Sequence, residues 1–289
     1  MGERKEARIL VPSEIKEILS GLGIAWDRRH GQHFLTDGRV LDRQVAYAKL
    51  SRRDTVLEIG PGLGALTGRL LGEAGKVVAI EKDTKLTEYL ETRFSAERKS
   101  GKLQIIAGDA LRTGLPEFDK VVSNLPYEIS SEITFRLLEN TRLCPFKLGI
   151  LMYQKEFAER MAARCGSDEY SRLSVNVYYR AECEVLENVP GSAFFPRPEV
   201  DSAMVRLVPR TSPPFRLADE GLFFEIVEAL FSHRRKKIGN GIELWLRGKG
   251  MKKCGWAKEL PFAGRRVETL EPREIGELCD EIASRMTMK

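Results

Sequence analysis

Residues that build disulfide frameworks and metal centres are scarce in this sequence. Its 289 residues include five cysteines and three histidines, and no two cysteines form a Cys-x-x-Cys pair. An odd cysteine count without paired spacing argues against a disulfide-stapled fold and against a zinc ribbon. We therefore expect a reduced, cytoplasmic protein without a metal site.

Long apolar segments are also missing. Residues 1–19 lack the apolar core of a signal peptide, and no run reaches the roughly 18 apolar residues that a membrane span needs. Apolar residues nevertheless make up 42% of the chain, which is enough for a sizeable core. The formal net charge is only +5, so the composition permits a polyanionic partner without requiring one.

Strands and helices alternate through the first part of the chain. Short apolar or β-branched runs predict strands at 55–60, 76–80, 103–107, 119–123 and 147–153. The segments between these runs have the spacing of helices. Such alternation is typical of an α/β fold, a mostly parallel sheet with helices on both faces.

The pattern changes toward the C-terminus. Two more strands are expected at 182–189 and 203–209, and residues from 219 onward show only helical periodicity. The proline-rich segment 211–215 separates the two patterns. We therefore predict an α/β domain over residues 1–210 and a smaller, mostly helical domain over 211–289.

A glycine-rich turn joins the first predicted strand of the sheet to a helix. In Gly60-Pro61-Gly62-Leu63-Gly64 the glycines allow a tight turn and close approach to a ligand, and the next helix offers free N–H groups. Glu81 ends the following strand, where a carboxylate can accept hydrogen bonds from two ribose hydroxyls. With Ala65 the turn also fits the dinucleotide pattern G-x-G-x-x-A, so a NAD-type oxidoreductase stays open, as does a turn without a ligand.

Two further acids favour S-adenosylmethionine as the cofactor. Glu58 lies two residues before Gly60, and Asp109 follows the third strand. At the carboxyl edge of the sheet, where such folds bind ligands, Asp109 can accept a hydrogen bond from the adenine amine of the cofactor. A helix cap or a turn is the other explanation for this aspartate.

The segment Asn124-Leu125-Pro126-Tyr127 at the end of the fourth strand indicates a specific chemistry. The exocyclic N6 of adenine is a poor nucleophile because its lone pair is delocalised into the ring. The Asn124 side-chain oxygen and the Leu125 carbonyl can accept both N6 hydrogens and favour a pyramidal nitrogen. Pro126 keeps Leu125 extended, and Tyr127 offers a face for stacking a base. The segment therefore predicts methyl transfer to an adenine amine by positioning and fixed dipoles, without a general base.

In these motifs the sequence resembles the ribosomal RNA adenine N6-dimethyltransferases. The shared motifs occur in the family's order: Gly31-Gln32-His33-Phe34-Leu35, Glu58 to Gly64, Asn124 to Tyr127, and Phe194 to Ser202. The resemblance covers about residues 30–210 and implies a Rossmann-like class I methyltransferase fold that binds S-adenosyl-L-methionine.

The resemblance also implies roles for single residues. The implied cofactor contacts are His33, Leu35, Gly60 and Gly62, with Glu81 on the ribose, Asp109 on the adenine and Asn124 at the reacting centre. Phe194 is expected to close over the target adenine opposite Tyr127, so that the two rings enclose a flipped base. The neighbouring Phe195 is expected to pack in the core.

Basic residues cluster in the predicted helical domain. They are Arg234, Arg235, Lys236, Lys237, Arg247, Lys249, Lys252, Lys253, Lys258, Arg265 and Arg266. Within this region only Glu243 and Glu259 oppose them. Such an excess suits a surface that binds phosphates, although a solvated helical face is the other interpretation.

The resemblance implies a substrate as well. It is the small-subunit ribosomal RNA near its 3′ end, in which two adjacent adenosines become N6,N6-dimethyladenosine, within a pre-ribosomal particle and through a monomeric enzyme. Dimethylation of one large-subunit adenosine is an alternative, and the long basic second domain argues against it. A non-catalytic RNA- or DNA-binding relative is another, and the intact Asn124–Tyr127 segment argues against it.

Overall fold

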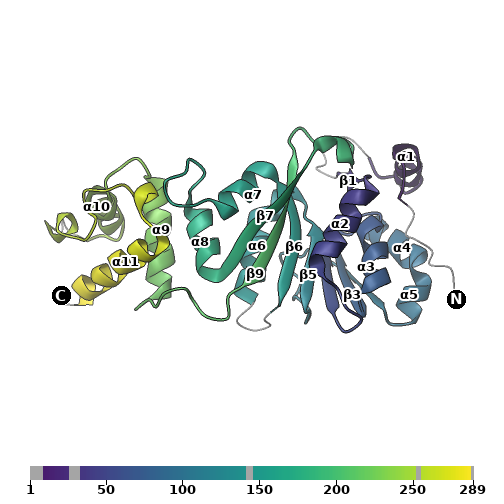
Figure 1. Cartoon of the computed structure of the whole chain (residues 1–289), viewed down its shortest axis with the longest axis horizontal. Coiled ribbons are helices and arrows are strands. Elements are labelled where there is room, and N and C mark those ends of the chain that lie inside the picture. Colours follow the sequence, from purple (N-terminus) through teal and green to yellow (C-terminus); the bar gives the residue numbers. More distant parts are fainter. Residues whose placement is uncertain (1–8, 26–32, 141–145, 252–254, 288–289) are drawn as a thin grey trace. The chain divides into compact units, whose positions relative to one another are not determined.

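The structure is a computed structural model that describes residues 9–25, 33–140, 146–251 and 255–287 (Figure 1). The chain divides into two compact units, Met1–Ala158 with Glu184–Pro209, and Glu159–Cys183 with Arg210–Lys289. The second unit thus includes residues 159–183, which the sequence placed in the first domain. Tyr170, Val175 and Tyr179 from this segment share one apolar core with the C-terminal helices, and a boundary drawn from the strand pattern does not reveal that packing.

The first unit is built around a seven-stranded sheet with the order β4-β3-β2-β5-β6-β9-β7. The strands are β2 (Thr55–Ile59), β3 (Lys76–Glu81), β4 (Leu103–Ala107), β5 (Lys120–Asn124), β6 (Leu148–Gln154), β7 (Ala181–Val189) and β9 (Ser202–Pro209). Neighbours from β4 to β6 run parallel, and β9 pairs antiparallel with β6. The predicted α/β class with a mostly parallel sheet is confirmed.

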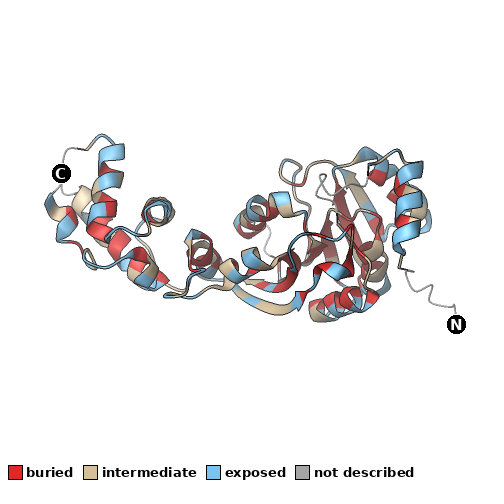
Figure 2. Ribbon diagram, turned by 90° about the horizontal axis from the view of Figure 1, so that it is seen from above, coloured by how far each residue is buried: buried red, intermediate tan, exposed pale blue. Residues whose placement is uncertain are grey.

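Helices cover both faces of this sheet (Figures 1 and 2). They are α2 (Gly38–Ala48), α3 (Ala65–Glu73), α4 (Thr84–Arg93), α5 (Ser95–Lys99), α6 (Ser130–Asn140) and α7 (Lys155–Ala162), with α1 (Pro12–Gly21) nearer the N-terminus. β2 and β3 are buried along almost their whole length. Burial on both faces explains why these strands are continuous apolar runs in the sequence.

The order of the strands decides where a ligand can bind. From β2 the chain continues to β3 and β4 on one side, and later returns to β5 and β6 on the other side. The connections therefore diverge at the carboxyl ends of β2 and β5, and a crevice at such a switch point is the usual ligand site of an open parallel sheet.

A second, two-stranded sheet was not predicted. β1 (Phe34–Leu35) pairs antiparallel with β8 (Phe194–Phe195), so that Leu35 lies opposite Phe194. Strands of two residues are too short to show periodicity, and their pairing joins segments far apart in the sequence. The small sheet places two of the sequence motifs side by side.

The second unit is helical. It contains α8 (Arg172–Arg180), α9 (Glu220–Ser232), α10 (Ile238–Gly248) and α11 (Pro272–Thr287). Fully buried Phe223, Ile242 and Leu278 pack together in its core. None of the helices in the described part of the chain is long and apolar enough to cross a membrane.

Candidate active site

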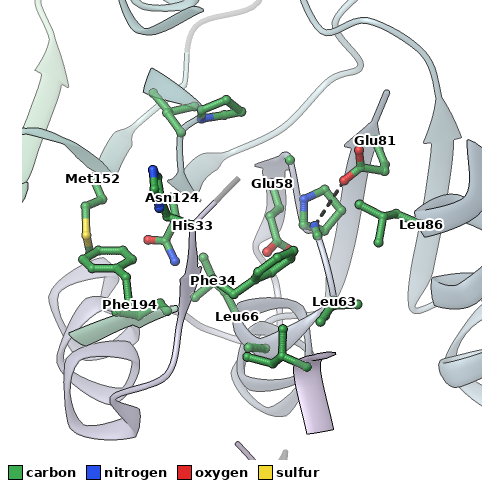
Figure 3. A pocket seen from close by; sticks show the side chains of 18 of the residues that line it. His33, Phe34, Glu58, Leu63, Leu66, Glu81, Leu86, Asn124, Met152 and Phe194 are labelled. Atoms are coloured by element: carbon green, nitrogen blue, oxygen red, sulfur yellow. Dashed lines mark hydrogen bonds between the residues drawn. The ribbon is translucent and has the colours of Figure 1, made fainter. Parts of the chain in front are cut away.

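A pocket of about 1020 Å³, its open mouth included, lies at the carboxyl ends of the central strands (Figure 3). Every residue predicted for the site lines it except Asp109. The predicted residues in its wall are His33, Leu35, Gly60, Gly62, Glu81, Asn124, Leu125, Pro126, Tyr127 and Phe194. The fold thus brings five separate sequence segments to one cavity.

The glycine loop between β2 and α3 needs glycine for two reasons. Gly60 and Gly62 have φ values of 67° and 56°, which side chains rarely adopt. A Cβ atom on Gly60 would lie 3.3 Å from Cγ of Pro126, and one on Gly62 would lie 3.2 Å from Cε1 of Phe34. The loop therefore packs closely against both the Asn124–Tyr127 segment and β1.

Glu81 binds the glycine loop directly. Its Oε2 accepts a hydrogen bond from the backbone N–H of Gly62 at 3.1 Å (Figure 3). Its Oε1 accepts one from the backbone N–H of Asp83 at 2.9 Å. The side chain is only 6% exposed, and this burial raises its pKa. In a dinucleotide site, a loop N–H such as that of Gly62 would face the pyrophosphate. Here it donates to the carboxylate of Glu81. This arrangement disfavours an anionic ligand at the loop.

Glu58 adds a second buried carboxyl group to the pocket. It is 2% exposed, and its Oε2 accepts a hydrogen bond from Oγ1 of Thr67 at 2.7 Å. Burial raises its pKa to about 8 against the opposing Thr67 hydrogen bond, and the charge of Glu81 contributes to the rise. From the sequence, Glu58 is a sign of the cofactor, but no contact with the ligand is assigned to it. The feature of the sequence that could have indicated its place in the pocket is that Glu58 is a single acid within an otherwise apolar strand. A cation bound beside the two acids would favour their ionised forms and oppose the rise in pKa.

Asn124 ends β5 with its side chain in the pocket (Figure 3). Its Oδ1 is buried and has no hydrogen-bond partner in the described part of the chain. A buried acceptor of this kind is costly unless a donor arrives from elsewhere. The backbone N–H of Leu125 donates to the carbonyl of Met152 at 3.3 Å, which ties the segment to β6. The cavity therefore presents a fixed acceptor to whatever enters it.

Tyr127, His33 and Phe194 form another part of the wall. The hydroxyl of Tyr127 lies 2.7 Å from Oγ of the buried Ser202, and burial raises the Tyr127 pKa. The His33 and Tyr127 ring centroids are 5.7 Å apart. The Nδ1–H of His33 donates to the carbonyl of Pro196 at 2.8 Å, which leaves Nε2 as an acceptor in the neutral ring. The resemblance implied that His33 faces the cofactor; here its ring also packs against Tyr127.

Asp109 lies beside the pocket and not in its wall. Its Oδ1 accepts from the backbone N–H of Leu111 at 3.0 Å, and its Oδ2 pairs with Nζ of Lys82 at 3.1 Å. Both interactions lower its pKa. The turn at Asp109 thus matches the structural explanation offered from the sequence. The Lys82 side chain is 77% exposed, so its release requires no rearrangement of the core.

Comparisons with known proteins agree with this geometry. The family model "Ribosomal RNA adenine dimethylase" matches residues 25–257. The chain belongs to the ribosomal RNA adenine dimethylase family. Its activity is therefore methyl transfer to adenine in ribosomal RNA, and the oxidoreductase interpretation is set aside.

Relatives of this family differ in their named substrates. A Methanosarcina acetivorans protein, "Probable ribosomal RNA small subunit methyltransferase A", is 52% identical and aligns over 86% of this chain and 91% of its own length. A Thermococcus onnurineus protein of the same name is 41% identical and aligns over 90% of this chain and 94% of its own length. The crystal structure of a Plasmodium falciparum dimethyladenosine transferase is 31% identical, with a TM-score of 0.75 over 88% of this chain and 98% of its own. The 23S rRNA methyltransferase ErmE is 27% identical, with a TM-score of 0.63 over 86% and 99%.

Several apolar residues of the pocket were not predicted. Helix α1 contributes Ile15, which forms one apolar cluster with Leu63 and Leu86; all three side chains line the pocket. Phe195 packs against the same cluster, as expected for a core residue. The sequence shows α1 only as a short helix, and nothing local indicates which loop it covers.

The basic residues that cluster in the second unit are partly neutralised by acidic partners. Arg234 pairs with Glu268 at 3.0 Å and Arg265 with Glu274 at 2.7 Å, and Lys249 also has an acidic partner. These acids lie outside the segment in which the sequence showed few opposing charges. Among the described residues of the cluster, those without an ion pair are Arg235, Lys236, Lys237 and Lys258; Lys252 and Lys253 lie outside the described residues.

Proposed function

We propose that the protein dimethylates two adjacent adenosines near the 3′ end of small-subunit ribosomal RNA with S-adenosylmethionine as methyl donor. The observation that carries the proposal is the buried Oδ1 of Asn124, an acceptor that no described residue partners, in a pocket with two acids. The relatives at 52% and 41% identity, both named for the small subunit, support this choice of substrate.

The pocket fits S-adenosylmethionine on its own chemistry. A cation bound beside Glu58 and Glu81 would favour their ionised forms, and Glu81 has lone pairs left for a ribose diol. Gly60 and Gly62 lack side chains where the methionine part would lie, and His33 and Leu35 would cover it. Asp109 would bind the adenine after Lys82 releases it. When bound, the cofactor supplies an electrophilic methyl group on a positively charged sulfur.

Asn124 and Leu125 would activate the target amine. The Oδ1 of Asn124 and the carbonyl oxygen of Leu125 accept the two N6 hydrogens, so that the nitrogen lone pair is directed away from the ring. These acceptors are fixed before the base arrives, because Leu125 is hydrogen-bonded to β6. Removing one such preorganised group from an active site commonly lowers the rate about 100- to 1000-fold.

Tyr127 and Phe194 would hold the flipped adenine between their rings. Ser202 fixes the Tyr127 hydroxyl at 2.7 Å, and the pairing of Leu35 with Phe194 fixes the opposite wall. Stacking on aromatic rings tolerates any base, so the amine acceptors supply the preference for adenine.

The second unit would bind the RNA backbone. Exposed Arg235, Lys236, Lys237 and Lys258 are available for phosphates because acidic neighbours do not neutralise them in the described structure. We place the protein in the cytoplasm, as a monomer that acts on a pre-ribosomal particle.

A large-subunit substrate is the second candidate. It is favoured by the likeness to the 23S rRNA methyltransferase ErmE. The identity to that protein is 27%, against 52% to a relative named for the small subunit. We therefore rank it below the small subunit.

The test is transfer of labelled methyl groups to under-methylated small subunits, with large subunits as the comparison. We expect N6,N6-dimethyladenosine in small subunits only. Asn124→Ala should abolish most transfer. Asn176→Ala is the matched control. The buried Oδ1 of Asn176 likewise has no partner among the described residues, but Asn176 lies on α8 in the second unit. Transfer to large subunits alone, or full activity of Asn124→Ala, would contradict the proposal.

A further inference from the structure

The two strands that carry the centre of the pocket are joined by main-chain pairing over only part of their length. Among the described residues, the pairing of β2 with β5 ends at Leu57 and Val121. By contrast, the ladder of β2 with β3 continues to Ile59, and the ladder of β5 with β6 continues to Asn124. The strands thus lose their direct connection just before they reach the pocket.

A side-chain hydroxyl replaces the missing pairing. Oγ of Ser123 donates to the carbonyl oxygen of Ile59 at 2.5 Å and accepts from the backbone N–H of the same residue at 3.3 Å. Ser123 is completely buried. Because Ile59 directly precedes Gly60 and Ser123 directly precedes Asn124, this one hydroxyl links the glycine loop to the amine-binding residue.

Gln44 on α2 supports the same point from outside the sheet. Its Nε2 donates to the carbonyl oxygen of Ser123 at 3.3 Å, and its side chain is completely buried. The Gln44 Oε1 has no partner among the described residues, which is unfavourable in an apolar core. An apolar side chain of the same shape would pack without that penalty. The bond to Ser123 is the feature of Gln44 that packing alone does not explain.

We propose that Ser123 and Gln44 are positioning residues that set the distance and direction of Asn124 relative to the glycine loop. The inference rests on the proposed function, because it concerns the placement of Asn124 against the target amine. Neither side chain belongs to the pocket wall, so both act through their neighbours. A displacement of about 1 Å at a reacting centre can lower a rate about 100-fold.

Two variants test the proposal. Ser123→Ala removes the bridging hydroxyl, and Gln44→Met removes the donor together with the unpartnered oxygen while the volume is kept. We expect kcat for methyl transfer to fall about 10- to 100-fold in both. The dissociation constant of S-adenosylhomocysteine, measured by calorimetry, should change less than about threefold. Ser123→Thr, which keeps the hydroxyl, should recover most of the rate.

The matched control is Tyr170→Phe. It deletes another buried hydroxyl, which donates to the carbonyl of Leu270 at 3.0 Å in the second unit. This variant should lower the melting temperature and leave kcat unchanged. Unchanged kcat in both Ser123→Ala and Gln44→Met would overturn the proposal, as would an equal loss of kcat in Tyr170→Phe.

Hydrogen exchange separates this proposal from the proposed function. The N–H of Gly60 donates to Ile80, and that of Leu125 donates to Met152, so both report on the two strand ends. We expect both amides to exchange about tenfold faster or more in the two variants than in the unsubstituted protein. If the unsubstituted protein transferred no methyl group, the proposed function would be wrong. The exchange rates of these two amides would still test whether Ser123 and Gln44 hold the strand ends in place. Unchanged exchange would overturn the positioning role.

Discussion

The Nδ1–H of His33 donates to the carbonyl oxygen of Pro196 across 2.8 Å. This bond lies next to the pairing of Phe34 with Phe195, so it extends the contact between β1 and β8 by one side chain. The segment expected over the cofactor and the segment expected over the target base therefore form one structural unit. A change in either should affect the other.

Removing the His33 donor should weaken this unit. We expect His33→Ala to reduce kcat/KM about 5- to 30-fold, because a partly buried hydrogen bond of about 1–2 kcal/mol is lost. His33→Asn should stay within about threefold of the unsubstituted protein, since the asparagine NH2 can also donate to Pro196. Steady-state kinetics with both substrates would measure this. An asparagine variant as impaired as the alanine variant would show that the imidazole ring, and not the bond, matters.

The pKa of Glu58 makes the stability of the ligand-free protein depend on pH. The folded-state pKa of about 8 lies above the ordinary value of 4.5, so folding favours the protonated acid. As pH rises from about 4.5, the unfolded chain loses this proton first, and stability falls until the pH passes about 8. The loss amounts to a few kcal/mol.

Glu58→Gln should remove most of this fall, as measured by urea unfolding between pH 5 and pH 8.5. Glu81, whose pKa is also raised, should account for part of the slope that remains. An unchanged slope in Glu58→Gln would show that another group causes the pH dependence.

Gly62 and Gly72 form a matched pair for testing the glycine loop. Gly62 has a φ of 56°, and a Cβ there would lie 3.2 Å from Phe34, so Gly62→Ala should destabilise the protein by about 1–2 kcal/mol. Gly72 lies near the end of α3 with open space around it, so Gly72→Ala should stabilise by about 0.5–1 kcal/mol. Thermal unfolding would measure both, and cofactor affinity should fall only for Gly62→Ala. Equal effects of the two substitutions would contradict the assigned backbone role.

The basic surface should show itself in the salt dependence of RNA binding. Changing Arg235, Lys236 and Lys237 to glutamine should lower the slope of log K against log salt by about 2–3, because about three phosphate contacts are lost. Arg285→Gln is the control, since Arg285 already pairs with Glu281 at 2.7 Å and with Glu259 at 3.1 Å. The control should change the slope by less than about 0.5. Filter binding at several salt concentrations would measure these slopes, and an unaltered slope in the triple variant would indicate a merely solvated face.

Local pattern accounts for the parts of the fold that the sequence predicted well. Strands β2, β3 and β6 are buried along almost their whole length, so each is a mostly apolar run of a length that distinguishes it from a helix. Helix α8 was not predicted, and its segment packs in the second unit through Val175 and Tyr179. Helix α8 belongs to the second unit because it packs against α9, which is remote in the sequence.

The sequence by itself determined the α/β order and the segments that can meet a ligand, because a glycine turn and an Asn-Leu-Pro-Tyr segment at strand ends must reach the same edge of a parallel sheet. Only the tertiary structure decided which side chains are partnered there. It paired Asp109 with Lys82, placed the carboxylate of Glu268 beside Arg234, and left Oδ1 of Asn124 without a donor from the part of the chain that is described. The physical reason is that a hydrogen bond or ion pair forms only when its atoms lie about 3 Å apart, to within a few tenths of an ångström, and the partners can be far apart in the chain. Those distances are set by packing and leave no periodic signal in the sequence.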